Sequence, residues 1–177
     1  YDGTTTATIT GTLNGVLAGD LANVSSTVGG TYASKNAGSN ITVTTNASLG
    51  GSAGGNYALV PVAGLKGNIS QATISGVTGI VAGNKTYDGT TAASLNTAGA
   101  SFGGMVGGDN LTVSGASGNF DNKNAGNGKT VTINGLTLGG VDAGNYTLAS
   151  STASTTANIS KATISGVTGI VAGNKIY

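Results

Sequence analysis

One stretch of fourteen residues occurs twice in this chain without a change. Residues 72–85 read ATISGVTGIVAGNK, and residues 162–175 repeat the same letters. A second motif, Tyr-Asp-Gly-Thr-Thr, starts at Tyr1 and again at Tyr87, and Tyr177 stands where a third copy would start. Self-similarity at a long, nearly fixed interval is typical of tandem structural modules. The sequence therefore predicts a slice from a longer array.

The composition favours a folded all-β protein over a disordered chain. Charged residues are few, seven Lys and six Asp, and the net charge at pH 7 is only +1. Disorder usually requires low hydrophobicity together with high net charge, whereas 38% of this chain is hydrophobic. Its threonines and valines favour half-buried strands, and its 33 glycines favour turns.

Alternation of polar and apolar residues predicts the positions of several strands. Near the start of the chain, threonines alternate with Ala7 and Ile9, which places the two residue types on opposite faces of a strand. We expect strands over residues 1–10, 41–44, 57–69, 131–134 and 146–159, and short strands near Val24 and Val113.

A spacing of aspartate, glycine and tyrosine suggests the type of β fold. In immunoglobulin-like sandwiches, a tyrosine near the start of the sixth strand folds its hydroxyl back onto the preceding corner, often after Asp-x-Gly-x-Tyr. Asp142, Gly144 and Tyr146 have this spacing, and the first repeat keeps Tyr57 but has Ala53 in place of the aspartate. We predict a tyrosine corner in both repeats, better braced in the second. The predicted fold is two tandem immunoglobulin-like β-sandwich modules arranged end to end.

The duplicated stretch is interpreted as the first strand of the module that follows it. Its glycines and β-branched residues argue against a helix and favour two short strand pieces joined by a bend. The predicted modules are residues 1–71, which lack their own first strand, residues 72–161, and residues 162–177 as the first strand of a following module. One hypothesis is that this unpaired copy fills the missing-strand groove of a neighbouring molecule, giving head-to-tail self-association by strand addition.

The Tyr-Asp-Gly motif predicts a recurring turn. In an Asx-type turn, the aspartate caps its own backbone and the glycine adopts a positive φ. A ligand-binding carboxylate is the alternative interpretation. The residues concerned are Tyr1, Asp2 and Gly3 in the first repeat and Tyr87, Asp88 and Gly89 in the second.

The residue inventory argues against catalysis. The chain has no His, Cys, Glu or Arg, and therefore no imidazole base, thiol nucleophile or guanidinium clamp. Lys123 occupies a position where a phosphate-binding loop ending at Gly128 needs glycine, and a calcium loop starting at Asp121 would need an oxygen ligand there. Low net charge disfavours nucleic acid, and no apolar run reaches the roughly 18 residues of a membrane span. We expect no enzyme activity, no cofactor, no metal site, no nucleic acid partner and no membrane insertion.

The ordered set of motifs is more specific than any one of them. It comprises Tyr-Asp-Gly-Thr-Thr, an Ala-Gly-Asp or Gly-Gly-Asp step, a Lys-Asn-x-Gly loop, an Asp-Ala-Gly-Asn-Tyr-Thr-Leu strand and an Asn-Ile-Ser-Lys-Ala tail. Through nearly the whole chain this set resembles YDG-type repeats of very large secreted bacterial adhesins, including filamentous-haemagglutinin-like exoproteins. The resemblance implies a secreted or cell-surface location, tandem modules forming a stalk, and no cofactor or catalytic residue. Ala53 and the glycine-rich residues 50–55 depart from the pattern.

These observations lead to an expected function of spacer or display repeats, with neighbouring repeats of the same chain as partners and the receptor-binding chemistry elsewhere. One alternative is that the modules themselves bind host or matrix glycans or proteins, which requires a recurring exposed patch. A parallel β-solenoid is another, but it would show a sub-period near 20 residues that the sequence lacks. The recurring aromatic positions are better explained as core: Tyr1 and Tyr87, Tyr32 and Phe120, and Tyr57 and Tyr146.

Overall fold

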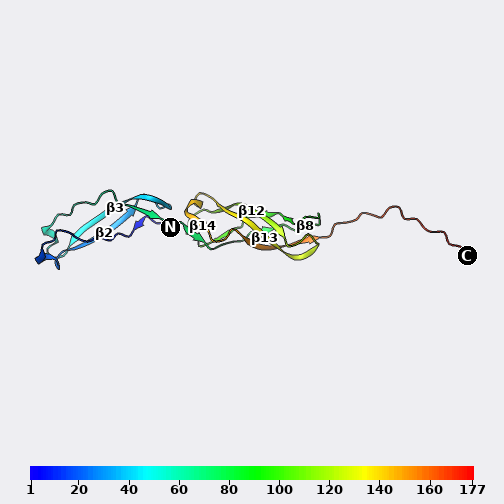
Figure 1. The fold of residues 1–177 in the computed structure, drawn as a ribbon, viewed down its shortest axis with the longest axis horizontal. Coiled ribbons are helices and arrows are strands. Elements are labelled where there is room, and N and C mark those ends of the chain that lie inside the picture. The colour runs from blue at the N-terminus through cyan, green and yellow to red at the C-terminus, as the bar shows by residue number, and fades with distance from the viewer. The chain divides into compact units, whose positions relative to one another are not determined.

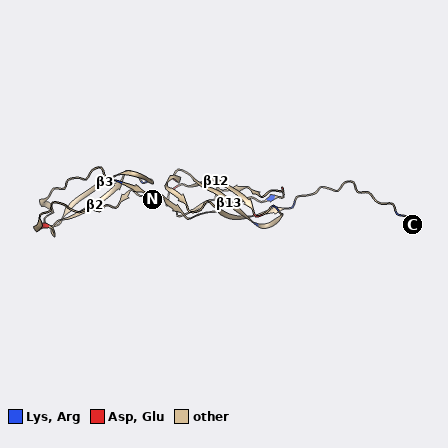
Figure 2. Ribbon diagram, viewed as in Figure 1, with Lys and Arg blue, Asp and Glu red and all other residues tan.

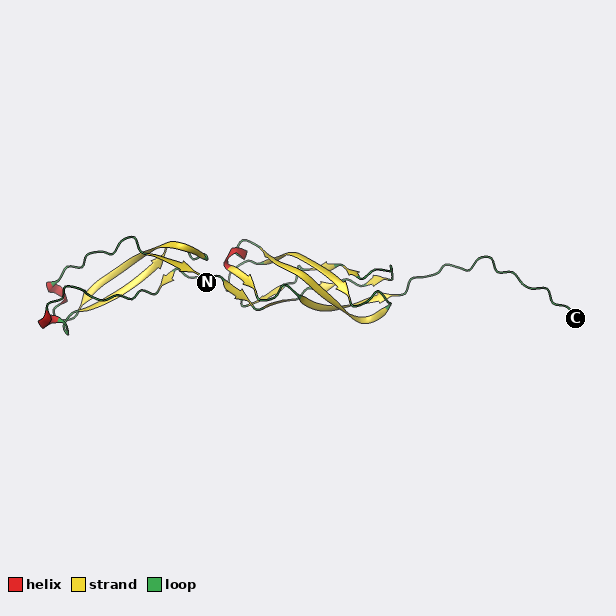
Figure 3. Cartoon of the chain, in the orientation of Figure 1, coloured by secondary structure: helices red, strands yellow, loops and turns green.

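The computed structural model describes all 177 residues and shows an all-β protein with several sheets (Figure 1). It has no α-helix, and the short red segments in Figure 3 are 3-10 turns. This confirms the all-β part of the predicted fold class. The residues form two compact units, each made of segments that are not continuous in sequence. Unit 1 comprises residues 1–74, 104–111 and 140–148, and unit 2 comprises residues 75–103, 112–139 and 149–177.

This grouping differs from the modules expected from the sequence, with residues 1–71, 72–161 and 162–177. Unit 1 contains the whole first repeat, the start of the duplicated stretch (residues 72–74) and two further segments of the second repeat, residues 104–111 and 140–148. Those two segments carry the Gly-Gly-Asp step and the predicted corner of the second repeat. The physical grouping therefore mixes residues from both sequence repeats.

Unit 1 is built on an antiparallel sheet in the order β1-β2-β3-β4. Its longest strands, β2 and β3, pair without a register shift from Ser25 opposite Gly50 to Tyr32 opposite Val43. The strands of this sheet are β1 (Thr6–Ala7), β2 (Ser25–Tyr32), β3 (Gly38–Gly50) and β4 (Lys66–Ile69). A parallel pair, β5 (Ala72–Ile74) with β14 (Tyr146–Leu148), and the 3-10 turns η1 (Ala18–Asp20), η2 (Gly54–Asn56) and η3 (Ala143–Asn145) complete the unit.

Unit 2 contains a larger sheet in the order β8-β15-β13-β12-β9 and two separate strand pairs, β10-β7 and β11-β6. All neighbours in the larger sheet are antiparallel except β15 and β8, which are parallel. The strands of the larger sheet are β8 (Lys85–Thr86), β9 (Ala92–Ala93), β12 (Thr112–Phe120), β13 (Gly126–Gly139) and β15 (Ala153–Ser160). The paired short strands are β6 (Gly76–Thr78), β7 (Val81–Ala82), β10 (Leu95–Asn96) and β11 (Ser101–Gly103).

The core of unit 2 forms where β7 packs against the larger sheet. Phe120, Val131 and Ile159 point into this core from three neighbouring strands, and each is at most 3% exposed. Ala82 of β7 and Ala157 of β15 belong to the same buried cluster. Burial of such side chains contributes roughly 1.5–3 kcal/mol each for the larger ones, so this cluster stabilises the unit.

Several strands differ in extent from the sequence-based expectation. The strand expected over residues 1–10 is reduced to β1, and that expected over residues 57–69 is reduced to β4. Pro61 lies in the segment that forms no strand, and Val60 beside it is 82% exposed. Proline lacks the N–H that a ladder needs, so this apolar segment remains unpaired.

The first copy of the duplicated stretch forms β5, β6, β7 and β8, four strand pieces rather than the two expected. The bend between β6 and β7 contains Gly79, whose φ is +76°. The second copy, residues 162–175, forms no strand and is exposed throughout (Figure 1).

Candidate functional site

Each sequence repeat contains a tyrosine whose hydroxyl binds an aspartate far upstream in the chain. Tyr57 donates a hydrogen bond to Asp20 Oδ2 at 2.8 Å, and Tyr146 donates one to Asp109 Oδ2 at 2.6 Å. The two pairs are equivalent, because each aspartate ends an Ala-Gly-Asp or Gly-Gly-Asp step and each tyrosine follows a 3-10 turn. The recurring tyrosine and the recurring aspartate therefore form a recurring pair.

A second hydrogen bond fixes the orientation of each hydroxyl. Tyr57 Oη accepts from the backbone N–H of Leu17 at 3.2 Å, and Tyr146 Oη accepts from that of Val106 at 2.9 Å. The partner lies 40 residues upstream in both cases. The hydroxyls thus bind a distant loop, whereas the tyrosine corner expected from the sequence would place them on the adjacent corner.

The predicted corner aspartate has its own structural role. Asp142 Oδ2 accepts a hydrogen bond from the backbone N–H of Asn110 at 2.8 Å. In the first repeat Ala53 has no carboxylate for such a bond, although its backbone N–H donates to the carbonyl of Asn23 at 3.0 Å. The second repeat therefore ties this loop with one more hydrogen bond than the first.

Asp109 is the centre of a cluster that contains side chains from both sequence repeats, all within unit 1. Its Oδ2 also accepts from Tyr1 Oη at 2.8 Å, and its Oδ1 lies 3.4 Å from Lys35 Nζ. The rings of Tyr1 and Tyr146 meet edge to face with centroids 5.4 Å apart. Only 2% of the Asp109 side chain is exposed, so its charge is compensated by two hydroxyls and one ammonium. We call Tyr1, Lys35, Asp109 and Tyr146 the Tyr–Asp cluster.

The Tyr–Asp cluster changes the pKa values of its members in the directions that hold it together. Burial, reinforced by the hydrogen bond to Asp109, raises the pKa of Tyr146 to about 12. The hydrogen bond from Tyr146 lowers the pKa of Asp109 despite its burial. Burial and the same carboxylate raise the pKa of Tyr1. At neutral pH the aspartate is therefore charged and both tyrosines are neutral donors, an arrangement suited to binding and not to proton transfer.

Amide side chains add a second set of contacts inside unit 1. Asn145 is 5% exposed, and its Oδ1 accepts from the backbone N–H of Ala37 at 2.9 Å while its Nδ2 donates to Asn36 Oδ1 at 3.3 Å. Gln71 Nε2 donates to the carbonyl of Gly144 at 2.9 Å. The Lys-Asn-Ala-Gly loop of the first repeat thus contacts the predicted corner of the second.

The Tyr-Asp-Gly motifs have the geometry of Asx turns. Asp2 Oδ1 accepts from the backbone N–H and the hydroxyl of Thr4, both at 2.8 Å. Asp88 Oδ1 accepts from the same groups of Thr90, both at 2.9 Å. The following glycines, Gly3 and Gly89, have φ values of +77° and +79°. Each carboxylate therefore binds groups of its own turn.

The two turns differ in one respect, the presence of a lysine. Lys85 Nζ donates to Asp88 Oδ1 and to the carbonyl of Ala92, each at 2.9 Å, and lies 5.5 Å from the ring centroid of Phe120. The backbone N–H of Thr90, followed by the Lys85 ammonium, lowers the pKa of Asp88 to about 2. Asp2 forms no ion pair in the structure.

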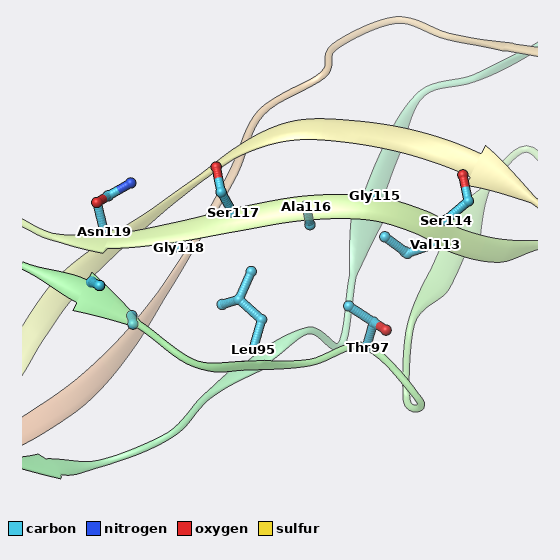
Figure 4. Close-up of a pocket in the computed structure, with 11 residues that line it drawn as sticks. Leu95, Thr97, Val113, Ser114, Gly115, Ala116, Ser117, Gly118 and Asn119 are labelled. Carbon is cyan, nitrogen blue, oxygen red and sulfur yellow. The ribbon is translucent and has the colours of Figure 1, made fainter.

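A depression of about 530 Å³ lies in unit 2 between residues 92–97 and strand β12 (Figure 4). Leu95 and Val113 line it, and no charged side chain does. Ser114 and Ser117 bind across to β13, through Thr137 at 2.9 Å and the carbonyl of Asn134 at 3.4 Å. The depression therefore offers no constellation for acid–base or nucleophilic chemistry.

No group of three or more Asp residues is arranged to hold a metal ion. No helix has the length and apolar character needed to cross a membrane. The sequence-based prediction named the tyrosines and Asp142 but missed Asp20, Asp109 and Lys35, although each recurs in phase in a shared motif.

Comparison with known proteins places this arrangement in a family. The YDG domain matches the chain over residues 1–64 and 70–156, which is most of its length. No curated protein and no solved structure matches it. With its two Tyr-Asp-Gly turns and two tyrosine–aspartate pairs, the chain belongs to the YDG domain family.

Proposed function

We propose that this chain provides structural spacer or display repeats in the stalk of a large bacterial adhesin, located at the cell surface or secreted. The observation that carries the proposal is the Tyr–Asp cluster. It joins side chains of the first repeat, Tyr1 and Lys35, to side chains of the second, Asp109 and Tyr146. All four belong to motifs that recur, so the same joint can form wherever two such repeats follow each other.

The Tyr–Asp cluster favours an array in which neighbouring repeats contact each other directly over one in which flexible linkers connect them. Unit 1 also contains the parallel pair of β5 and β14, in which Ala72 pairs with Tyr146 and Ile74 with Leu148. A strand pair, a buried carboxylate and several side-chain hydrogen bonds restrict independent motion of the repeats that they connect. In solenoids and other repeat proteins, such nearest-neighbour contacts supply much of the stability.

The surface chemistry suits a spacer. Little of the ribbon carries the colours of charged residues (Figure 2). The exposed positions are mainly Thr, Ser, Asn and Gly. Neutral hydroxyl and amide groups remain hydrated, and their hydration depends only weakly on salt. Without cysteine, the array is also insensitive to thiol–disulfide chemistry.

In this proposal each repeat is an immunoglobulin-like β-sandwich. The five-stranded sheet of unit 2 would form one layer, and the short pairs β10-β7 and β11-β6 would form the second. The packing of Ala82 from β7 against Phe120 and Val131 of the larger sheet supports this interpretation. An experimental structure in which the short pairs do not form a continuous second sheet would contradict it.

The test is to immobilise the chain and measure binding to a broad panel of glycans and matrix proteins. A spacer is expected to give no saturable binding to any of them. Saturable binding that is lost when one exposed patch is altered would show instead that the repeats are adhesive themselves. Protease accessibility of the repeats on intact cells of the source organism would test the surface location.

A further inference from the structure

Unit 1 has an open apolar groove where unit 2 has a strand. The groove, of about 190 Å³, is lined by Ile9, Val28, Leu59, Val62 and Leu65 among others. Leu59 and Val62 are 39% and 60% exposed, which is unusual for large apolar side chains that line a concavity.

The alignment of the two repeats shows which strand is missing. Counting from Tyr1 and Tyr87, Ile9 corresponds to Leu95, which pairs with Ala82 of β7 in unit 2. Ile9 in unit 1 belongs to no strand and has no such neighbour in the structure. The core of unit 1 is correspondingly less closed, with Ile69 half-buried while its counterpart Ile159 is 2% exposed.

The duplicated stretch of residues 162–175 is the complementary feature, a strand sequence without a partner. Val167 and Ile170 are 76% and 78% exposed, whereas the same residues in the first copy, Val77 and Ile80, are 8% and 6% exposed. The segment has the sequence that fills the groove of unit 2 and forms no strand of its own.

We propose that residues 162–176 of one molecule fill the unit 1 groove of a second copy of this chain, giving head-to-tail association. Ala172 then takes the place that Ala82 occupies in unit 2, and Ile170 that of Ile80. Lys175 and Ile176 pair in parallel with Ile69 and Ser70, as Lys85 and Thr86 pair with Ile159 and Ser160.

The lysine of the inserted segment completes a turn that lacks one. Asp2 already accepts from the N–H and hydroxyl of Thr4, as Asp88 does from Thr90, but no ammonium contacts it. In the association, Lys175 binds Asp2 as Lys85 binds Asp88. Its ammonium approaches the ring of Tyr32, the counterpart of Phe120, which Lys85 approaches at 5.5 Å.

A second, separate contact favours the same partner and the same orientation. Asp20 is bound by Tyr57 as Asp109 is by Tyr146, but it lacks the tyrosine and lysine that Tyr1 and Lys35 supply to Asp109. The counterparts of those two residues are Tyr87, which is 39% exposed, and Lys123, which is exposed.

The position of Tyr87 relative to the donated segment fits this contact. The backbone N–H of Tyr87 donates to the carbonyl of Ser160, two residues before the donated segment. The amino group of Tyr1 makes the same bond to the carbonyl of Ser70. Insertion of the segment would therefore bring Tyr87 and Lys123 of the donor to Asp20 of the acceptor.

The alignment also limits the length of the donated strand. Tyr177 corresponds to Tyr1, which the acceptor already has in place. The donor must therefore leave the groove after Ile176, and Tyr177 lies outside it. Fourteen identical residues and Ile176 remain for pairing, a length comparable to that of β5 to β8 together.

The test is light scattering coupled to gel filtration of the full chain over a wide range of concentrations. We expect concentration-dependent dimers and longer species. Ile170→Asp would place a charge in the groove and weaken association by at least about 100-fold. Because Ile170 is exposed in the single molecule, this variant keeps the circular dichroism spectrum and melting temperature of the monomer.

Thr168→Asp is the matched control, since its counterpart Thr78 is exposed in the filled groove, and it should associate like the wild type. Tyr87→Phe should weaken association by roughly 10-fold through the lost bond to Asp20. A monomer at every concentration would overturn the proposal, as would equal association by Ile170→Asp or by a chain ending at Lys161. An unchanged Tyr87→Phe variant would overturn the second contact. The panel of glycans and matrix proteins tests the spacer function independently of this association.

Discussion

The two copies of the duplicated stretch have identical sequences and different structures. In the first copy Ile74 is fully buried, while its counterpart Ile164 in the second is 86% exposed. The first copy forms strands against β14, β11, β10 and β15, and the second forms none. Since the residues are the same, the difference shows that the strand conformation comes from the partners that each copy meets.

The physical reason lies in the composition of the stretch. Three glycines and short β-branched segments give it little conformational preference of its own, and each short strand offers only two or three ladder pairs. Ordering such a segment costs roughly 1–2 kcal/mol per residue, which only burial of its apolar side chains can offset.

The largest contrast is expected for the two equivalent isoleucines. Ile74→Ala should lower the free energy of unfolding by about 2–5 kcal/mol, because it leaves a cavity at a fully buried position. Ile164→Ala should change the monomer by less than about 0.5 kcal/mol. Urea denaturation at low protein concentration measures both. Equal effects would mean that the second copy is packed in solution.

The tyrosine–aspartate pairs allow a smaller contrast between the repeats. Tyr146→Phe removes a donor from a carboxylate that is 2% exposed, and should cost about 1–3 kcal/mol. Tyr57→Phe should cost about 1 kcal/mol or less, since Tyr57 is only half-buried and water can replace the lost donor, whereas Tyr146 is 3% exposed. Thermal unfolding of both variants checks the order, and a larger loss for Tyr57→Phe would contradict it.

The raised pKa of Tyr146 also predicts the behaviour of the protein in alkali. Because its folded-state pKa is about 12 and its ordinary value is 10.0, the contribution of this group is fully present below pH 10 and is lost as pH rises through 12. The wild type should therefore lose stability between pH 10 and 12 more steeply than Tyr146→Phe. If the stability of the two proteins fell equally between pH 10 and 12, the hydrogen bond between Tyr146 and Asp109 would not contribute to stability.

Replacement of the loop aspartate, Asp142, is expected to lower the free energy of unfolding by about 0.5–1.5 kcal/mol. Asp142→Ala removes the bond to the N–H of Asn110 and makes the second repeat resemble the first, which has Ala53 there. The variant should lose that amount of stability and exchange the Asn110 amide hydrogen faster. Unchanged exchange would show that the carboxylate does not hold this loop.

The smallest effect concerns the two Asx turns. The pKa of Asp88 is lowered to about 2 and that of Asp2 is also lowered, so each turn contributes stability above pH 3.8. The contribution of Asp88 is lost as pH falls through 2. Carboxyl titration by NMR should give a midpoint near 2 for Asp88, and Lys85→Met should raise it. If Lys85→Met leaves the midpoint unchanged, the ammonium has no part in the turn.

The sequence predicted local features better than long-range partners. Period-two alternation indicated β3 and β13, and the glycines marked turns, because both signals act within a few residues. The bond between Tyr146 and Asp109 spans 37 residues, and no local pattern records it. The only sequence signal is that the aspartate and the tyrosine each recur at equivalent positions of the two repeats. This recurrence marks both residues as important but does not predict that they bind each other.

The extents of the strands were missed for a similar reason. Residues 25–32 are rich in Ser, Thr and Gly and have a weak strand signal, yet β2 pairs along its whole length because β3 supplies an unbroken ladder. Residues 57–65 have a stronger apolar signal, but Pro61 and the absence of a neighbouring strand leave them unpaired. Pairing depends on the neighbour, which a single sequence does not show.

The parallel direction of β8 and β15 has a consequence for folding errors. Two identical segments compete for one groove in unit 2, and residues 162–175 follow β15 directly, so proximity alone would favour the wrong one. A strand that follows its neighbour through a tight turn can only pair antiparallel, because a parallel crossover needs about a dozen residues or more. The wrong copy therefore cannot occupy the groove in the native direction, and strand polarity suppresses a kinetic trap that sequence identity would otherwise create.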